Sequence, residues 1–224
     1  MASRESTKER LSRDTVVTAA LALADTEGLE TLTIRRLATD LGVTPMALYW
    51  HFKDKERLLD GVSELVLDEI VLPAADPSRP WDEELRDILG ALLAALRAHP
   101  AVTEVVKNRI LLCDSGLELT ERVLGTLRGA GFSVEQSAQV AVQALVTLVG
   151  LVYAEPGVAQ PEESEDDFEL RLRTKKAQLL TLAPKRYPHV VEAADPLTSC
   201  GSSDGYFDVG LDVLIHGMRG VLGS

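Results

Sequence analysis

Four ring-bearing side chains follow one another at Tyr49, Trp50, His51 and Phe52, in a chain with only 4% aromatic residues. The helix expected here is short, and Leu48 and Phe52, one turn apart, already occupy its inward face. A local aromatic core would need a longer helix, so Tyr49 and Trp50 point outward and need a partner. At the start of a helix that fits a DNA major groove, such a pair can contact thymine methyl groups and phosphates.

The residues before this cluster have the pattern of a helix-turn-helix. Thr33 is a cap residue before an apolar helical repeat, and Ala38 is small enough for a second helix to cross close to it. Gly42, four residues later, can take the left-handed conformation that reverses the chain. Thr44 and Pro45 then start the short helix, as cap and first helical residue. The pattern predicts that the short helix crosses its predecessor.

Residues that could perform catalysis or hold a metal are scattered. Cys113 and Cys200 match no metal or redox spacing, and the four histidines lie far apart. Gly125 and Gly129 follow a predicted helix rather than a strand, so they do not form a phosphate-binding loop. We therefore expect no enzymatic activity, no cofactor and no metal site.

Helical periodicity continues through the chain. Helices are predicted after Ser12 and Thr33, from about 55 to 70, and near 81–98, 101–112, 115–129, 133–154, 165–182 and 204–222. No run alternates as a strand does, and the proline-rich segment 71–80 reads as a linker. We expect an all-α protein with a helix-turn-helix domain over residues 1–60 and a helical effector-binding and dimerisation domain over 61–224.

The net charge and the hydropathy of the chain bear on its DNA contact and on its location in the cell. The net charge of −12 divides into −1 over residues 1–60 and −11 over 61–224, so the acidic body discourages non-specific DNA contact. Residues 136–154 carry no charge and could span a bilayer, but Gln139, Gln143 and Thr147 form a polar stripe that favours burial against protein. With no apolar leader at the N-terminus, we expect a cytoplasmic protein with no membrane partner.

The run LTIRRLATDLGVTPMALYWHFKDKERLLD resembles the DNA-binding domain of the TetR family of transcriptional regulators. The resemblance is strong over about residues 10–70 and continues more weakly through WDEELRDILGALLAALRAHP and YFDVGLDVLIHGMRGVL. It implies that Arg35 reads a guanine edge and that Lys55 clamps a phosphate with help from the helix dipole. The residues that we expect on DNA are Thr33, Arg35, Thr44, Pro45, Met46, Ala47, Tyr49, Trp50, His51 and Lys55. Ile34 and Thr44 to Met46 depart from the pattern of the tetracycline-binding members of that family, so no operator sequence is carried over.

The resemblance also implies a body that binds a small-molecule effector. Tetracycline-binding members of the family use polar and magnesium-linked side chains, and the corresponding positions here are Val71, Ile88 and Val106. We therefore expect a mostly apolar effector without metal, with Arg109 either available to a carboxylate or carbonyl or simply a surface residue. The predicted pocket comprises Val71, Ile88, Leu92, Leu96, Val106, Arg109, Gln139, Gln143 and Thr147, and the alternative is that its apolar members simply fill the core.

A short recognition helix reads only a few base pairs, so specificity requires two half-sites about 34–36 Å apart or a multiple of that. We therefore expect a homodimer, most simply a repressor, on a palindromic double-stranded DNA operator, released by its effector. Helices 133–154 and 204–222 are apolar over most of their surface, and the expected dimer contacts are Leu145, Val149, Leu211, Leu214, Ile215 and Met218. A small all-α enzyme or a helical interaction module would leave the outward Tyr49 and Trp50 unexplained.

Overall fold

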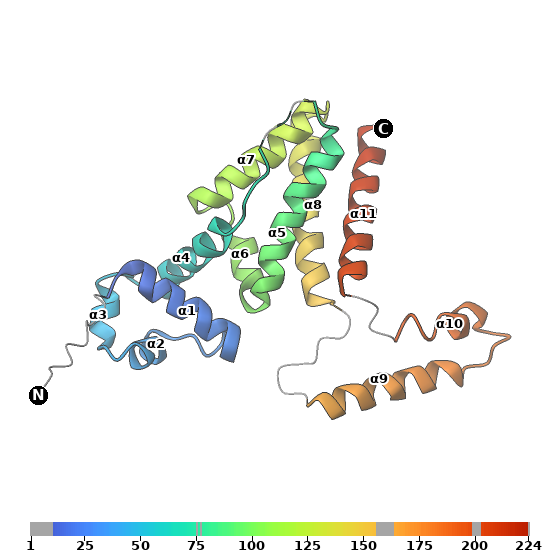
Figure 1. Ribbon diagram of the computed structural model, residues 1–224, viewed down its shortest axis with the longest axis horizontal. Helices are drawn as coiled ribbons and strands as arrows, with labels where there is room; N and C mark the ends of the chain where they lie inside the picture. The colour runs from blue at the N-terminus through green and yellow to red at the C-terminus, as the bar shows by residue number, and fades with distance from the viewer. Residues whose placement is uncertain (1–10, 75, 77, 156–163, 199–202, 224) are drawn as a thin grey trace, which may run out of the picture.

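The computed structural model describes residues 11–74, 76, 78–155, 164–198 and 203–223, and within these ranges it has helices and no strand. The helices form a head, a body and a projecting arm (Figure 1). In chain order they are α1 (Arg13–Glu27), α2 (Ile34–Asp40), α3 (Pro45–Tyr49), α4 (Lys55–Asp68), α5 (Trp81–Ala98), the 3₁₀ turn η1 (Pro100–Val102), α6 (Thr103–Arg109), α7 (Asp114–Gly129), α8 (Val134–Tyr153), α9 (Glu165–Leu180), α10 (Pro188–Glu192) and α11 (Ser203–Leu222). The predicted all-α class is confirmed.

The head consists of α1, α2 and α3 packed with the first half of α4. The helices α1, α2 and α4 are capped at their N-termini by Ser12, Thr33 and Asp54. Each capping side chain accepts a hydrogen bond from the backbone N–H three residues later. Gly28 and Gly42 have φ of 89° and 64°, the left-handed region where a side chain is disfavoured. The helix starts predicted at Ser12 and Thr33 and the chain reversal predicted at Gly42 are therefore confirmed.

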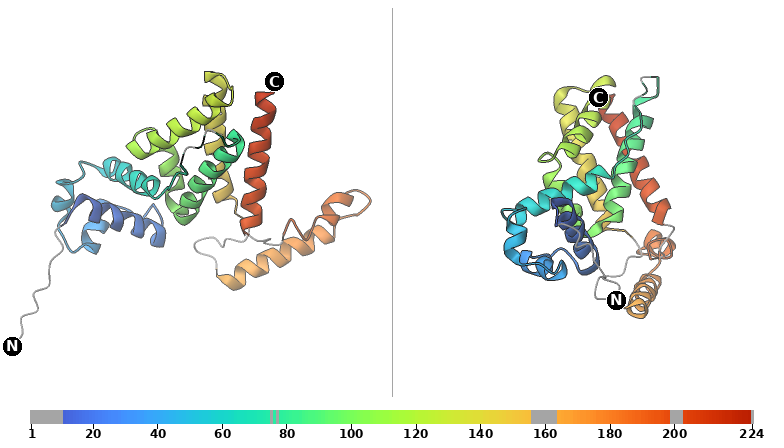
Figure 2. Two further views of the ribbon diagram at one scale, coloured as in Figure 1. Left: turned by 45° about the horizontal axis from the view of Figure 1, so that its top comes forward. Right: turned by 60° about the vertical axis from the view of Figure 1, so that its left-hand side comes forward.

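The body is organised around α5, which packs against α7, α8 and α11. Its apolar face, including Ile88 and Leu96, is buried, and each such side chain contributes about 1.5–3 kcal/mol of transfer free energy. On its other edge, Arg86 pairs with Asp208 and Asp212 of α11. Apolar packing and ion pairs together attach the C-terminal helix to α5; Figure 2 shows the course of the two helices in two further views.

The arm, formed by α9 and α10, projects away from the body (Figures 1 and 2). None of the described side chains of α9 is buried, and Leu170 and Leu180 are exposed. The short α10 begins at Pro188 and was not predicted, because five residues are too few for a periodic signal. The arm contributes nothing to the core of its own chain.

Two helices of the body bear on the sequence predictions: the one expected near 101–112 and the apolar α8. The helix expected near 101–112 is divided into η1 and α6 and ends earlier, at Arg109. The apolar α8 is long and apolar enough to cross a membrane, but it packs against α5, α6, α7 and α11. It behaves as a helix of the body, with Gln139 and Gln143 exposed along one side.

Candidate DNA-reading surface and effector cavities

The short helix α3 has one buried side and one exposed side, as its sequence predicts. Leu48 within it and Phe52 just beyond it are almost fully buried, whereas Met46 is 66% exposed and Trp50 85% exposed. Thr44 has the extended backbone of an N-cap but makes no side-chain cap hydrogen bond, and Pro45 occupies the first turn. An apolar and aromatic surface with a hydroxyl at its edge thus faces solvent.

Two neighbouring arginines of α2 have different surroundings. Arg36 pairs with Asp40 in the next turn and with Glu27 of α1. The hydrogen bond and charge of Asp40 raise the pKa of the Arg36 guanidinium above its usual value. Arg35 is exposed and forms no ion pair within the described residues. Its guanidinium is therefore available for the bidentate contact that guanine offers.

None of the residues expected on DNA is buried in this chain. Thr33, Arg35, Thr44, Pro45, Met46, Tyr49 and Trp50 are exposed, and Ala47, His51 and Lys55 are half-buried. Lys55 is the first residue of α4, where the positive end of the helix dipole adds to its charge. All ten residues expected on DNA are therefore at least partly accessible from solvent, as a DNA contact requires.

The residues expected around an effector are not brought together. Ile88, Leu92, Leu96 and Val106 lie in the buried core, so the alternative that they fill it describes most of this group. Val71 is 85% exposed in the linker. The polar stripe of α8, Gln139, Gln143 and Thr147, lines a groove of about 450 Å³ against α11 instead. The sequence placed the stripe on the correct helix, but helical periodicity does not say which neighbour each side meets.

An apolar cavity of about 640 Å³ lies between α5, the α6–α7 turn, α7 and α8. Most of its lining is aliphatic, with Lys107, Asn108 and Thr120 as polar members. Of the predicted pocket residues, Leu92 lines it, and so does Leu145, which was expected at the dimer contact. This form, mostly apolar with a few polar groups, is typical of a small-molecule site.

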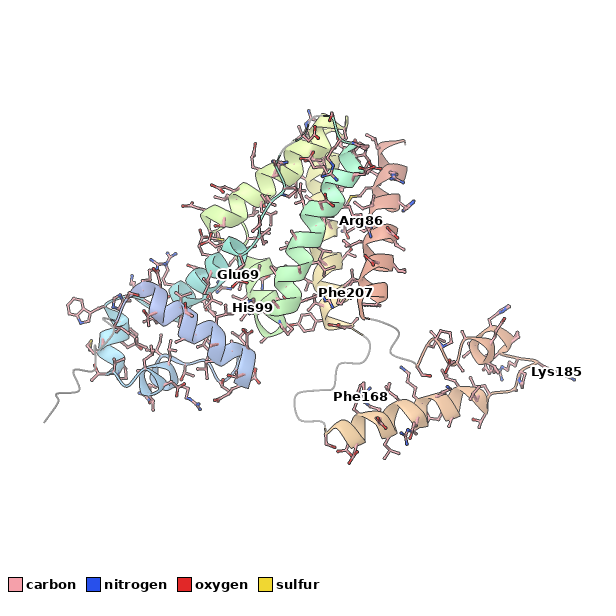
Figure 3. All side chains as sticks on the ribbon, viewed as in Figure 1. Glu69, Arg86, His99, Phe168, Lys185 and Phe207 are labelled. Carbon is pink, nitrogen blue, oxygen red and sulfur yellow. The ribbon has the colours of Figure 1, made fainter. Side chains whose placement is uncertain are left out.

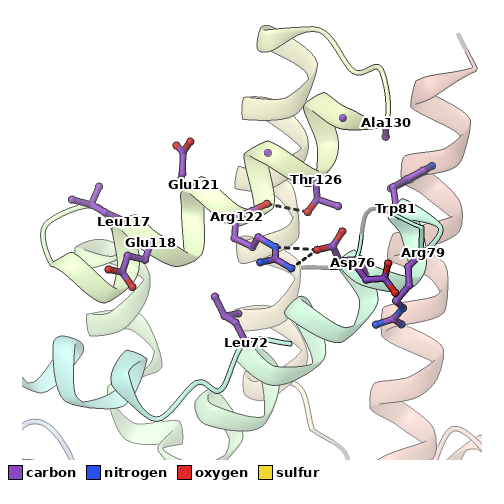
Figure 4. Close-up of a pocket in the computed structure, with 13 residues that line it drawn as sticks. Leu72, Asp76, Arg79, Trp81, Leu117, Glu118, Glu121, Arg122, Thr126 and Ala130 are labelled. Carbon is purple, nitrogen blue, oxygen red and sulfur yellow. Dashed lines mark hydrogen bonds and ion pairs between the residues drawn. The ribbon is translucent and has the colours of Figure 1, made fainter. Parts of the chain in front are cut away.

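A larger and more polar groove of about 1160 Å³ lies between α7 and the segment that leads into α5 (Figure 4). Trp81 forms one wall, and Arg122 crosses the groove to pair with Glu84, with 3.0 Å between Nε and Oε1. Arg122 also donates to the carbonyl oxygen of Pro73. These bonds tie α7 to α5 and to the linker, so Arg122 already has a structural role here.

An acidic edge on α4, formed by Glu56, Asp60, Glu64 and Asp68, contacts the residues on both sides of the α6–α7 turn. The Arg109 Nε donates to Asp60 at 3.1 Å, and the same guanidinium pairs with Glu56. At the start of α7, the Ser115 backbone N–H and hydroxyl donate to Glu64 at 3.3 and 3.0 Å, and the hydroxyl also contacts Asp68. Arg109 therefore links α6 to α4 and does not line the apolar cavity. The four-residue spacing of these acids is the sequence signal that could have revealed the contact.

The residues expected at the dimer contact are mostly internal. Val149, Leu211, Ile215 and Met218 are buried within the single chain, where they hold α8 and α11 to the body. Leu214 is half-buried in the α8–α11 groove. The exposed apolar positions of α11 are Val209, Val213 and Val221. The most apolar faces of α8 and α11 thus pack inward, and the four buried residues are occupied within their own chain.

Cys113 is buried at the α6–α7 turn. Its burial, together with Glu64, raises the pKa of the thiol to about 11. The thiol is thus protonated and unreactive at neutral pH. The described residues contain no group of three His, Cys, Asp or Glu side chains that could hold a metal ion.

A helix-turn-helix head with an exposed recognition surface, joined to a helical body with an apolar cavity, defines a ligand-responsive DNA-binding regulator. Residues 16–62 match the family described as "Bacterial regulatory proteins, tetR family", and residues 72–222 match "Tetracyclin repressor-like, C-terminal domain". The chain therefore belongs to the TetR family and is a transcriptional regulator.

Relatives with a described role agree with this assignment. The chain is 30% identical to the HTH-type transcriptional repressor DrrR1 of Streptomyces coeruleorubidus, over 95% of this chain and 78% of that one. It is 31% identical to the class C tetracycline repressor protein of Escherichia coli, over 94% and 91%. These matches extend across head and body alike.

Solved structures are similar over the same range. The TetR family protein ActR of Streptomyces coelicolor, in complex with actinorhodin, has a TM-score of 0.80 at 28% identity, covering 96% of this chain and 99% of that one. BioQ with its double-stranded DNA operator has a TM-score of 0.58 at 30% identity, covering 74% and 96%. The fold is thus one that has been seen with a ligand and with DNA in different proteins.

Proposed function

We propose that the protein is a cytoplasmic, homodimeric repressor that leaves a palindromic operator when a mostly apolar small molecule binds the cavity between α5, α6, α7 and α8. One observation carries the proposal: the α6–α7 turn forms a wall of that cavity, and Arg109 and Ser115 on either side of the turn are bonded to α4. Since α4 begins in the head, a ligand that displaces the turn also displaces the head.

The energetics of release follow from linkage. An effector shifts the equilibrium between DNA-binding and released arrangements only by the difference of its affinity for the two. The DNA weakens effector binding by the same factor. The similarity to ActR, solved with actinorhodin, and to BioQ, solved with its operator, supports binding of both an effector and DNA by the present chain. A metal-chelated tetracycline is not the expected effector, because Val71, Ile88 and Val106 offer it no ligands.

The proposed dimer forms through α8 and α11. Val209 and Val213 expose apolar surface on α11, and the adjoining groove presents Gln139 and Gln143 of α8. An apolar strip bordered by neutral polar groups can be buried against its own symmetry mate without leaving a charge unpaired. Two heads held in this way would meet two half-sites of a palindrome.

The test begins by selecting a duplex for this protein from random-sequence DNA. With about 6–10 phosphate contacts, the slope of log affinity against log salt is expected near −5 to −9. Apolar metabolites and antibiotics, with tetracycline plus magnesium beside them, are then screened for release of that duplex. A flat salt response, or tight magnesium-dependent tetracycline binding that releases DNA, would contradict the proposal.

A matched pair of variants locates the effector. Leu145→Trp fills the apolar cavity, and Val134→Trp introduces the same side chain at an exposed position of the same helix that does not line it. Both are expected to bind the duplex as the wild type does. Release by the effector should weaken about tenfold or more in Leu145→Trp alone, a loss of about 1.4 kcal/mol of effector binding. Equal release of both variants would place the effector elsewhere.

A further inference from the structure

His99 occupies the corner where α5 ends and the chain turns toward α6. The segment Pro100–Arg109 runs at 103° to α5, and the His99 carbonyl oxygen accepts hydrogen bonds from the Val102 backbone N–H at 3.2 Å and the Thr103 hydroxyl at 3.4 Å. Thr103 is itself fully buried. The corner is therefore well fixed, and with it the point from which the imidazole projects.

The imidazole contacts a carboxylate with each of its two nitrogens. Nδ1 lies 2.7 Å from Oδ2 of Asp25 on α1, and Nε2 lies 3.2 Å from Oε2 of Glu69, the C-cap of α4. The His99 side chain is only 16% exposed. Figure 3 shows His99 and Glu69 at the junction between head and body. One ring thus joins a helix of the head, the helix leading out of it, and the corner of the body; we call these three residues the Asp25–His99–Glu69 bridge.

The chemistry of the bridge depends on a proton. A neutral imidazole carries one N–H, and an ionised carboxylate only accepts, so a neutral ring can donate to one of the two acids and turns a lone pair toward the other. An imidazolium donates to both and balances part of their charge. Histidine is the side chain whose charge ordinarily changes between pH 5 and 8.

Other charged groups on the surrounding helices are paired elsewhere. Arg97 of α5 pairs with Glu155 and Asp204, Glu104 of α6 pairs with Lys107, Glu27 of α1 pairs with Arg36, and Asp68 of α4 contacts Ser115. Within the described residues, the ring's ion-pair partners are therefore Asp25 and Glu69.

We propose that His99 is a positioning residue that, when protonated, fixes the head on the body and thereby tightens operator binding as pH falls. The inference rests on the DNA-binding function and adds a control to it that is separate from the effector cavity. A head held by two charge-assisted hydrogen bonds loses less conformational freedom when it settles on its half-site. As pH rises, one of the two bonds is lost and the head gains freedom.

The experiment measures affinity for the selected duplex between about pH 6 and pH 8 at constant ionic strength. At the lower pH, the wild type should bind the duplex about three- to tenfold more tightly than His99→Gln does. At the higher pH, the two proteins should bind it equally. His189→Gln, on α10 and far from the head, is the control and should follow the wild type. His51 of the head is unchanged in all three proteins, so any contribution that it makes cancels in the comparison.

Asp25→Asn provides a rescue that a merely structural role would not give. The introduced amide can donate to an unprotonated Nδ1 while Nε2–H donates to Glu69, so both contacts survive without a proton. This variant should keep the low-pH affinity of the wild type up to about pH 8. A His99→Gln profile that superimposes on that of the wild type, or a wild-type advantage that grows with rising pH, would overturn the proposal.

A second readout needs no DNA. Amide hydrogen exchange, corrected for its intrinsic pH dependence, should show about threefold or greater extra protection at low pH in the last turns of α1 and α4 of the wild type, and none in His99→Gln. Equal protection in both proteins would overturn the bridge whatever the DNA result. If no duplex is selected, the DNA proposal fails while the exchange measurement still decides the bridge.

Discussion

Trp50 and Phe52 are two residues apart and have opposite surroundings, which makes them a matched pair at the scale of single residues. Trp50 is 85% exposed, so Trp50→Ala should change the free energy of unfolding by no more than about 0.5 kcal/mol. Its affinity for the selected duplex should nevertheless fall about tenfold or more, as expected of an aromatic anchor. Phe52→Ala, at a buried site, should instead cost about 3–5 kcal/mol of stability. Denaturant unfolding and band-shift titration together separate the two effects; retained affinity in Trp50→Ala would remove Trp50 from the DNA contact.

The exposure of α3 was predictable because so short a helix has room for only one inward face. The difference between Arg35 and Arg36 was predictable only in part. Asp40 follows Arg36 by four residues, whereas Thr39 holds that place after Arg35, so the sequence contains the first ion pair. The second partner, Glu27, belongs to another helix and depends on how the helices cross, which local sequence does not encode.

At the scale of elements, two glycines of α7 should respond oppositely to the same substitution. A Cβ on Gly116 would overlap the carbonyl oxygen of Ile110, whereas one on Gly125 meets nothing within 4 Å. Gly116→Ala should therefore force open the α6–α7 turn at a cost of about 1–3 kcal/mol. Gly125→Ala should gain about 0.5–1 kcal/mol from helix propensity. Urea unfolding followed by circular dichroism measures both, and equal stability of the two variants would contradict the tight crossing.

Capping residues and glycine stops predicted most helix bounds, since a cap such as Thr33 or a stop such as Gly42 acts within a few residues. The apolar cavity proposed for the effector was harder to predict. Its wall is the α6–α7 turn, where α6 ends earlier than its apolar pattern suggested, and the acidic edge of α4 holds that turn from outside the pocket. A pattern of apolar residues alone does not distinguish a side chain that fills the core from one that borders a cavity.

At the scale of the whole molecule, the two domains have separate electrostatic roles. The net charge is −1 over residues 1–60 and −11 over 61–224. The acidic body repels DNA phosphates, so that contact is restricted to the head. Because one head reads only a few base pairs, the proposed dimer is what turns this contact into sequence specificity.

The proposed dimer is tested with two variants, each of which introduces one negative charge on a different side of the α8–α11 pair. Val213 of α11 is 69% exposed beside the α8–α11 groove, and Val142 of α8 is 59% exposed on the side of the apolar cavity. Val213→Glu should bury an unpaired carboxylate in the proposed contact at a cost of about 3 kcal/mol or more. Light scattering should then report a monomer, and affinity for the palindrome should fall to that of a single half-site. Val142→Glu should remain a dimer with unchanged DNA affinity, since its charge stays in solvent or at the cavity, where it would weaken only the effector. A stable dimer of Val213→Glu would show that the two chains meet through another surface, and the exposed arm of α9 and α10 would be the next to test.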